Sequence, residues 1–302
     1  MWIINNRKYF FALSGLLATL SIVAMFAFGF NFGIDFTGGS ITEVSYTEDR
    51  PDLDAMKAAI DENGEYEGYS VRSASEDAYV IRTKQIDETK KNALVELVSF
   101  GNIGNVTIER FNSIGPVAGE ELRNKSYVAI AVVILAILLF VIFAFRKVSQ
   151  PVPSWKYGIA TIVALLHDVL IPTGIFVVLG HLVGIEIDLL FVAALLSIMG
   201  YSVNDTIVVF DRVRENLLDN KETNLKEDFD ETVGRGLMQT MARSINTSVT
   251  TITVLVFLYF LGGEATKNFS LILLLGMIAG TYSSIFLASP LLVKFAGDAK
   301  GK

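Results

Sequence analysis

The sequence predicts a helical membrane protein that also carries a separate α+β domain. Hydrophobic residues make up 52 % of the 302 residues and the mean hydropathy is +0.48, which is too apolar for a soluble domain of this size. The apolar residues form six long blocks, each near the roughly 20 residues that a helix needs to cross a bilayer. One long polar region, residues 31–125, instead alternates strand-like and helix-like segments.

The six apolar blocks predict six transmembrane helices. The first occupies residues 1–30. The other five lie within residues 126–294, at about 127–145, 158–180, 189–210, 244–262 and 269–292, with a cytoplasmic loop at 211–243 and a tail at 295–302. The small-x-small sequence Ala27-Phe28-Gly29 also permits a cleaved signal peptide. Because the first apolar run has about 20 residues rather than the 7–15 of a signal peptide, we expect a retained helix.

The distribution of Lys and Arg predicts the orientation. The basic residues lie before the first span, between spans two and three, between spans four and five, and after the sixth: Arg7, Lys8, Arg146, Lys147, Lys156, Arg212, Arg214, Lys221, Lys226, Arg235, Arg243, Lys294, Lys300 and Lys302. The opposite loops, His181–Asp188 and Gly262–Asn268, contain only Lys267. Both termini are therefore expected in the cytoplasm, and residues 31–125 outside.

The polar region 31–125 has the element order of a ferredoxin-like domain. In chain order we expect a strand at Ser40–Tyr46, a helix at Arg50–Gly64, a hairpin of residues 68–74 and 78–84, a helix at Asp87–Gly101 and a strand at Asn105–Gly115. This order, βαββαβ, is that of the split βαβ fold. Acidic side chains outnumber basic ones here. The acidic surface is either merely solvated or a docking surface for a polypeptide or a partner domain.

Composition excludes several classes of site. The chain has no cysteine, so disulfides, thiolate metal ligands and cysteine nucleophiles are absent, and two histidines make a histidine-rich metal centre unexpected. No P-loop motif occurs, and no arrangement indicates an activated nucleophile. The sequence therefore predicts neither an enzyme nor a nucleic-acid-binding protein.

Several polar residues lie within the apolar blocks. Asn204 and Asp205 interrupt the fourth block, and Asp205 would lie roughly 7–10 Å inside the cytoplasmic boundary. A charged side chain at the centre of a membrane helix costs about 2.5–3.5 kcal/mol, so such residues face the protein interior and mark ion or proton paths. Arg243, at the entrance of the fifth span, is the candidate partner of Asp205, and Thr247 shares its helix face. Asp168, after His167, adds a second acid in the third span.

Each of these residues also has a structural interpretation. Asp205 could be a permanently protonated residue bonded to neighbouring hydroxyl groups. Arg243 could be a positive-inside anchor whose guanidinium reaches water.

Six motifs resemble the SecD/SecF family of protein-export membrane proteins, within the resistance-nodulation-division superfamily, on its SecF side. They occur in family order: "FGIDFTGG" (Phe32–Gly39), "GPVAGEEL" (Gly115–Leu122), "LLHDV" (Leu165–Val169), "GYSVNDTIVVFDRVREN" (Gly200–Asn216), "QTMARSINTSVTT" (Gln239–Thr251) and "GTYSSIF" (Gly280–Phe286). The first motif supplies the family signature positions Gly33, Asp35, Phe36, Gly38 and Gly39. The acidic connection Leu217–Thr232 is longer than the family pattern, which leaves its contacts open.

The resemblance implies half of a twelve-span transporter-like unit in a bacterial cytoplasmic membrane, with the other six spans supplied by a SecD chain. It implies as further partners the SecYEG channel, YajC, a translocating polypeptide and membrane lipids. Protons would be the coupling ion, with no other cofactor. The implied proton relay comprises Asp205, Arg243, Thr247, Asn204 and Asp168.

Two other functions use the same pattern. A small-solute or lipid exporter half-unit should have a large apolar cleft in its outside domain. A non-catalytic scaffold for SecD should tolerate replacement of Asp205 or Arg243.

Overall fold

The computed structural model describes residues 1–146 and 151–300, and they form two compact units. One unit combines Met1–Asn31 with Val128–Lys302, and the other is Phe32–Tyr127. Lys147 and the last two residues of the predicted tail, Gly301 and Lys302, lie outside the described residues.

Within the described residues, six helical segments are long and apolar enough to cross a membrane, as predicted. They are α2 (Arg7–Phe28), α6 (Pro116–Ala144), α7 (Ser154–Val183), α8 (Leu189–Glu222), α9 (Phe229–Leu261) and the continuous run of α10 (Glu264–Ser283), η2 (Ser284–Ala288) and α11 (Ser289–Lys300). A short helix, α1 (Trp2–Asn5), precedes them. Within an 18-residue apolar stretch of each helix, 50 % is buried in α7 and in α8, but only 6 % is buried in α6. The core of the unit is therefore α7, α8 and the last segment.

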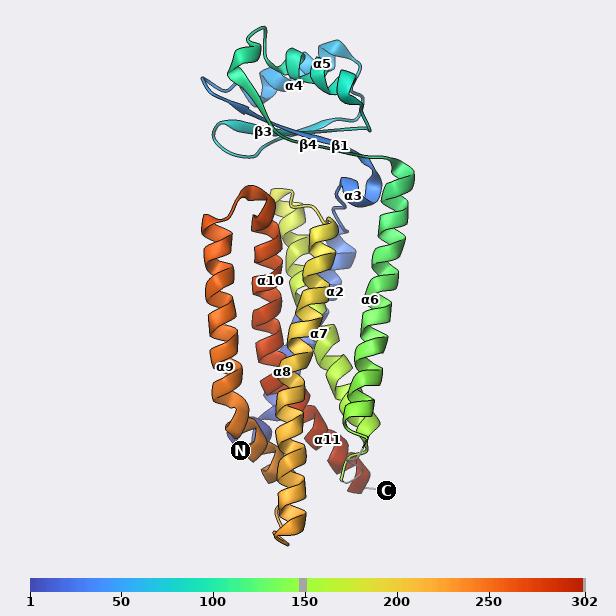
Figure 1. The fold of residues 1–302 in the computed structure, drawn as a ribbon, viewed down its shortest axis with the longest axis vertical. Helices are drawn as coiled ribbons and strands as arrows, with labels where there is room; N and C mark the ends of the chain where they lie inside the picture. The colour runs from blue at the N-terminus through green and yellow to red at the C-terminus, as the bar shows by residue number, and fades with distance from the viewer. Residues whose placement is uncertain (147–150, 301–302) are drawn as a thin grey trace. The chain divides into compact units, whose positions relative to one another are not determined.

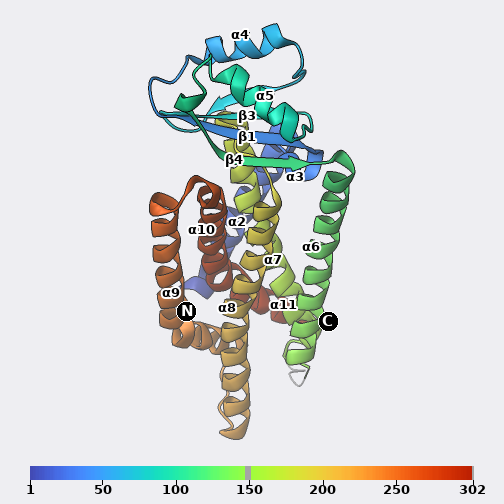
Figure 2. The same cartoon turned by 45° about the horizontal axis from the view of Figure 1, so that its top comes forward.

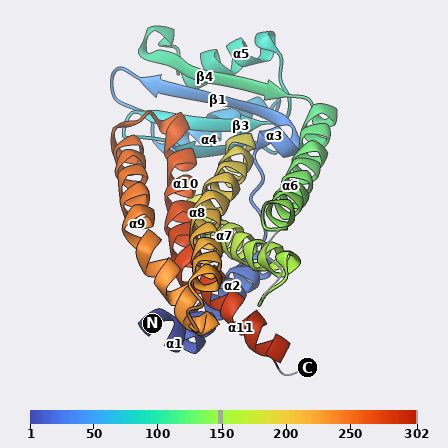
Figure 3. The ribbon, with the colours of Figure 1, turned by 60° about the horizontal axis from the view of Figure 1, so that its bottom comes forward.

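Both chain ends lie at the same end of the helical unit, and the turn between α8 and α9 extends beyond that end (Figures 1 and 3). An even number of spans requires this placement of the ends. Close helix contacts depend on small residues. A Cβ atom on Gly276 of α10 would lie 2.1 Å from Ile198 Cδ1 of α8, and one on Gly174 of α7 would lie 2.4 Å from Ser21 Cβ of α2.

The predicted loop 211–243 is largely helical, because α8 continues to Glu222 and α9 begins at Phe229. A polar cluster joins the two helix ends. Arg235 donates to Glu227 Oε2 and to Asn220 Oδ1, both at 2.7 Å. Burial raises the pKa of the Glu227 carboxyl, but hydrogen bonds from Arg235, Asn220 and Thr232 outweigh it and lower this pKa below its usual value.

Residues 32–127, all of which the structure describes, contain a four-stranded antiparallel sheet in the order β2-β3-β1-β4. The strands are β1 (Gly39–Tyr46), β2 (Ser70–Ser73), β3 (Ala78–Thr83) and β4 (Val106–Ile114). Helices α4 (Leu53–Asn63) and α5 (Glu88–Val98) cover one face of the sheet (Figure 2). The remaining short elements are α3 (Ile34–Thr37) and η1 (Ile103–Asn105). This topology confirms the ferredoxin-like expectation.

Local sequence signals explain the ends of the helices in this unit. Gly64 ends α4 in the left-handed conformation, with φ of 68°. The Asp87 side chain accepts a hydrogen bond from Lys90 N and so caps α5. Under the helices, the Tyr46 hydroxyl donates to Val98 O at 2.9 Å, and burial raises the pKa of Tyr46 to about 12. The unit therefore has its own apolar core with a satisfied polar group inside it.

Candidate functional site

Asp205 of α8 accepts hydrogen bonds from serines on two other helical segments. Ser244 of α9 donates to Oδ1 at 2.5 Å, and Ser284 of η2 donates to Oδ2. Both serines are at least 99 % buried, whereas Asp205 is half-buried. Three elements therefore meet at this carboxyl group.

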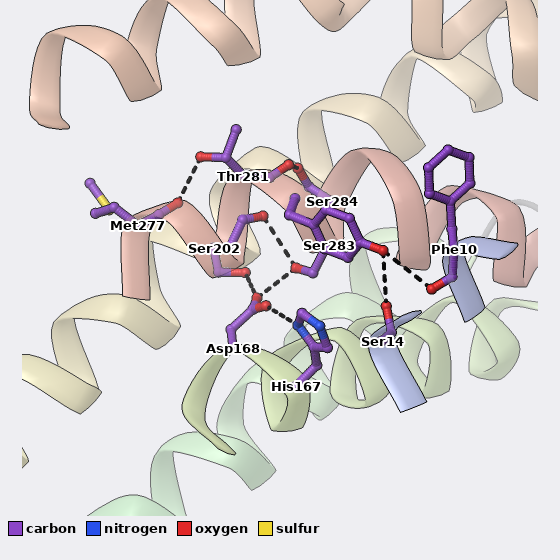
Figure 4. Close-up of polar contacts among 11 residues, drawn as sticks. Phe10, Ser14, His167, Asp168, Ser202, Met277, Thr281, Ser283 and Ser284 are labelled. Atoms are coloured by element: carbon purple, nitrogen blue, oxygen red, sulfur yellow. Dashed lines mark hydrogen bonds and ion pairs between the residues drawn. The ribbon is translucent and has the colours of Figure 1, made fainter. Parts of the chain in front are cut away.

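A second acid, Asp168 of α7, has a similar arrangement (Figure 4). Its Oδ2 accepts hydrogen bonds from Ser202 of α8 and, at 2.7 Å, from Ser283 of α10. Its Oδ1 lies 3.0 Å from Nδ1 of His167. Asp168 is completely buried. Gly280 leaves the space for this contact, since a Cβ there would lie 3.2 Å from Ser202 Cβ and 3.7 Å from Asp168 Oδ2.

The two acid sites are joined at one point of the chain. Ser283, which binds Asp168, is followed directly by Ser284, which binds Asp205. Ser284 is also the first residue of η2, a π-helical turn. Ser289, the first residue of α11, donates from its Oγ to Ser284 O at 3.0 Å. Such π-helical turns are rare inside α-helices, and those that do occur are often found at functional sites. A change in the helical register at η2 would therefore affect both acids together.

Hydroxyl groups suit an acid that changes its protonation state. A serine hydroxyl can donate to a carboxylate, and after rotation it can accept from a carboxylic acid. Asp205 and Asp168 can therefore remain hydrogen-bonded in either state, which removes much of the penalty for a buried polar group. The arrangement presents no activated nucleophile, and its chemistry is compatible with an acid that binds and releases a proton.

The structure places the other predicted relay residues differently. Asn204, Arg243 and Thr247 are exposed on the surfaces of α8 and α9. Thr247 shares the Arg243 face as expected, since its hydroxyl donates to Arg243 O at 2.9 Å. Among the described residues, Arg243 forms no ion pair with Asp205. The reason is geometric: Ser244 points at Asp205, and the preceding residue of a helix is rotated by about 100°. The Asp205–Arg243 pair stays a prediction.

Four serines of the site were not singled out from the sequence: Ser202, Ser244, Ser283 and Ser284. The available signal was the presence of hydroxyl residues in apolar blocks, and "GTYSSIF" contains two of them. Sequence spacing does not reveal which helices approach one another, so the partners of these serines were not predictable.

The signature residues Gly33, Asp35, Phe36, Gly38 and Gly39 lie in the second unit, at α3 and the start of β1. Gly38 and Gly39 have φ of 71° and 121°, which disfavours other residues. A Cβ on Gly38 would lie 2.8 Å from Pro116 Cα, and one on Gly39 would lie 2.8 Å from Thr83 O. The two glycines thus allow α3 to pack against the start of α6 and the end of β3.

Comparisons with known families identify both regions. Residues 95–298 match the model "Protein export membrane protein SecD/SecF, C-terminal", and residues 23–49 match the "SecD/SecF GG Motif". The first match contains both acids, and the second contains the two glycines.

Similar proteins match along nearly the whole chain. The protein translocase subunit SecF of Thermobaculum terrenum is 43 % identical over 303 residues, covering 97 % of this chain and 93 % of the relative. The subunit SecF of Anaerolinea thermophila is 34 % identical over 292 residues, covering 96 % of this chain and 92 % of the relative.

One solved structure relates the fold to a longer protein. The crystal structure of SecDF, a translocon-associated membrane protein from Thermus thermophilus, superposes with a TM-score of 0.81 at 33 % identity. The superposition covers 97 % of this chain but 38 % of the SecDF chain. The present chain therefore corresponds to one part of that longer SecDF chain.

Proposed function

Since the chain belongs to the SecD/SecF family of protein-export membrane proteins, as a SecF subunit of the protein translocase, we propose that it couples proton flow to polypeptide export. It is a multi-pass transport component rather than an enzyme. In this proposal the proton motive force across a bacterial cytoplasmic membrane drives a late step of translocation, and residues 31–125 act on the emerging polypeptide outside.

The observation that carries the proposal is the environment of Asp205. An acid within an apolar helix is held by two serine hydroxyl groups from two other elements. A proton that reaches Asp205 neutralises it and lets the acid donate one hydrogen bond to a serine, while its other oxygen still accepts. Release of the proton restores the carboxylate and its attraction for donors. Each change alters the contacts that hold α8, α9 and η2 together.

The energies are of the right order for a switch of this kind. One charge that crosses 100 mV contributes about 2.3 kcal/mol. A change of a two-state population from 1:99 to 99:1 needs about 5.5 kcal/mol. One proton therefore biases the equilibrium, and a full conversion needs more than one proton or an added pH difference.

The exposed polar residues of α8 and α9 support a partner chain of the SecD type. Asn204, Arg243 and Thr247 lie at predicted membrane depth, where polar side chains normally face protein rather than lipid. The SecDF relative of Thermus thermophilus is longer, and this chain spans 40 % of it. In the proposal a SecD chain covers this face, and Arg243 is attracted by the acids of the complex, including Asp205 when it is ionised. Association with SecYEG and YajC belongs to the same proposal.

Export into inverted membrane vesicles tests the function. Vesicles that contain the full translocase are assayed with and without a proton gradient. Asp205→Asn should insert and bind SecD normally but lose the gradient-dependent part of export, because an amide takes up no proton. Ser197→Ala is the matched control, since this exposed hydroxyl on the same helix donates to Ala193 O rather than to an acid. Full gradient-dependent export by Asp205→Asn would contradict the proposal and support the scaffold function.

A further inference from the structure

His167 has one ring nitrogen that the Asp168 site does not use. Nδ1 lies 3.0 Å from Asp168 Oδ1, while Nε2 is buried and has no hydrogen-bond partner within residues 1–146 and 151–300. The side chain as a whole is 4 % exposed. A buried nitrogen without a partner carries a free-energy cost, because it has lost its hydrogen bond to water. A water molecule or a proton at Nε2 would remove this cost.

A largely apolar groove, lined in part by His167, lies beside this site. It has a volume of about 330 Å³ and runs between α2, α7, η2 and α11. Its walls include Phe11, Ser14, Leu166, His167, Leu170 and Lys294. Lys294 is exposed, on the last helix of the chain, so the groove lies in the half of the unit that contains both chain ends. In the proposed orientation this is the cytoplasmic half.

The aromatic ring of Tyr282 fixes the imidazole from the other side. The two rings stack with centroids 5.7 Å apart, and the Tyr282 hydroxyl donates to Phe10 O at 3.2 Å. The imidazole is thus held between Asp168 and the groove by contacts from α7, α10 and α2.

We propose that His167 and Asp168 form a second proton-binding site that exchanges protons with the groove and is coupled to Asp205. The proposal rests on the proposed function and extends it. With Nδ1–H donated to the Asp168 carboxylate, the lone pair of Nε2 takes a proton from a hydronium ion in the groove and leaves water. The pair then changes from a net charge of −1 to an imidazolium–carboxylate pair of net charge zero. No other bond forms or breaks.

The coupling to Asp205 runs through the adjacent serines of the π-helical turn. Ser283 holds Asp168 and Ser284 holds Asp205, so a movement of one serine displaces the other. The charged and titratable groups around His167 are Asp168 on its own helix, Tyr282 of α10, Lys294 of α11 and, through the serines, Asp205.

Nitrogen NMR of the complete chain in complex with SecD, in lipid nanodiscs, tests the site. The chain has two histidines, so ¹⁵N-histidine labelling combined with His181→Asn leaves His167 as its single imidazole. The signal of Nε2 should report proton uptake as the pH is lowered, while Nδ1 keeps its proton. Asp168→Asn should alter this response, because it removes the carboxylate beside Nδ1. An imidazole fixed in one protonation state, for example beneath a lipid chain that fills the groove, would overturn the proposal.

Access through the groove is tested by filling it. Gly15 lines the groove and has open space where a Cβ would stand, so Gly15→Leu should fill it without a backbone clash. It should slow proton exchange at Nε2 at least tenfold. Leu16→Phe is the control, because Leu16 is the next residue but lies 56 % exposed outside the groove. Equal exchange rates in the two variants would contradict the access route.

Two results separate this proposal from the function on which it rests. Asp205→Asn should move the His167 midpoint measurably, and an unchanged midpoint would overturn the coupling. His167→Asn keeps a donor for Asp168 but has no basic nitrogen, so it should reduce gradient-driven export at least tenfold. If export is normal in His167→Asn but lost in Asp205→Asn, the second site fails and the proposed function stands.

Discussion

Removing the Ser284 hydroxyl should make export require a larger proton gradient. Ser284 provides one of the two hydrogen bonds that Asp205 accepts within the described residues. A hydrogen bond to a charged group contributes about 1.5–3 kcal/mol. Ser284→Ala should therefore raise the free energy of ionised Asp205 relative to its protonated form by that amount, since the protonated acid can still donate to Ser244. Proton release becomes the more difficult step.

This free energy converts into measurable quantities. At about 2.3 kcal/mol per charge and 100 mV, the potential for half-maximal export should increase by roughly 65–130 mV. At a fixed gradient the rate should fall roughly 10- to 150-fold if release limits it. The assay is export into inverted vesicles at a series of imposed potentials.

The control for Ser284→Ala is a buried serine of α10, the helix that precedes η2. Ser270 is completely buried, and its hydroxyl donates to Lys267 O rather than to an acid. Ser270→Ala should leave the potential dependence unchanged. If Ser284→Ala and Ser270→Ala give the same curve, the hydrogen bond to Asp205 has no part in coupling and the reasoning is refuted.

Three further predictions concern stability and packing. Gly276→Ala should destabilise the helical unit by about 1–3 kcal/mol, because its Cβ would lie 2.1 Å from Ile198 Cδ1; thermal unfolding in detergent should show the loss, and Ile198→Ala should restore most of it. Glu227 has a lowered pKa in the folded protein, so its contribution to stability is present above its unfolded pKa and is lost as pH falls through the folded value; Glu227→Gln should flatten the acid side of a melting-temperature profile. Gly38→Ala should lower the melting temperature of the isolated protein, because a Cβ on Gly38 would lie 2.8 Å from Pro116 Cα. Gly68→Ala should lower it less, because Gly68 has a similar φ but no atom within 4 Å of the added Cβ.

The class of fold was predictable because strong physical constraints leave clear sequence patterns. A bilayer requires about 20 apolar residues per helix, so six spans follow from six blocks. The βαββαβ unit follows from a few local signals, such as Gly64 after one helix and Asp87 before another, which the structure confirms as caps. Residues that are costly in lipid, Asp168 and Asp205, stood out for the same reason.

The contacts inside the site were not predictable, because they depend on the rotation of each helix about its axis. The sequence suggested Arg243 as the partner of Asp205, which stays a prediction, and did not suggest the next residue, Ser244, which donates to Asp205 in the structure. Adjacent helical residues differ by about 100° in direction, so a shift of one position selects a different side chain. The π-helical turn at Ser284 adds a further displacement that a 3.6-residue period does not contain.

The central claim is that Asp205 gains and loses a proton within the membrane. Infrared difference spectroscopy of the complete complex in lipid, with Asp205→Asn to assign the band, follows the carboxyl group directly as pH is changed on either side. The account predicts a protonated-carboxyl band that appears and disappears with pH and is absent from Asp205→Asn. A band that stays constant over the whole range in which export depends on the gradient would contradict it.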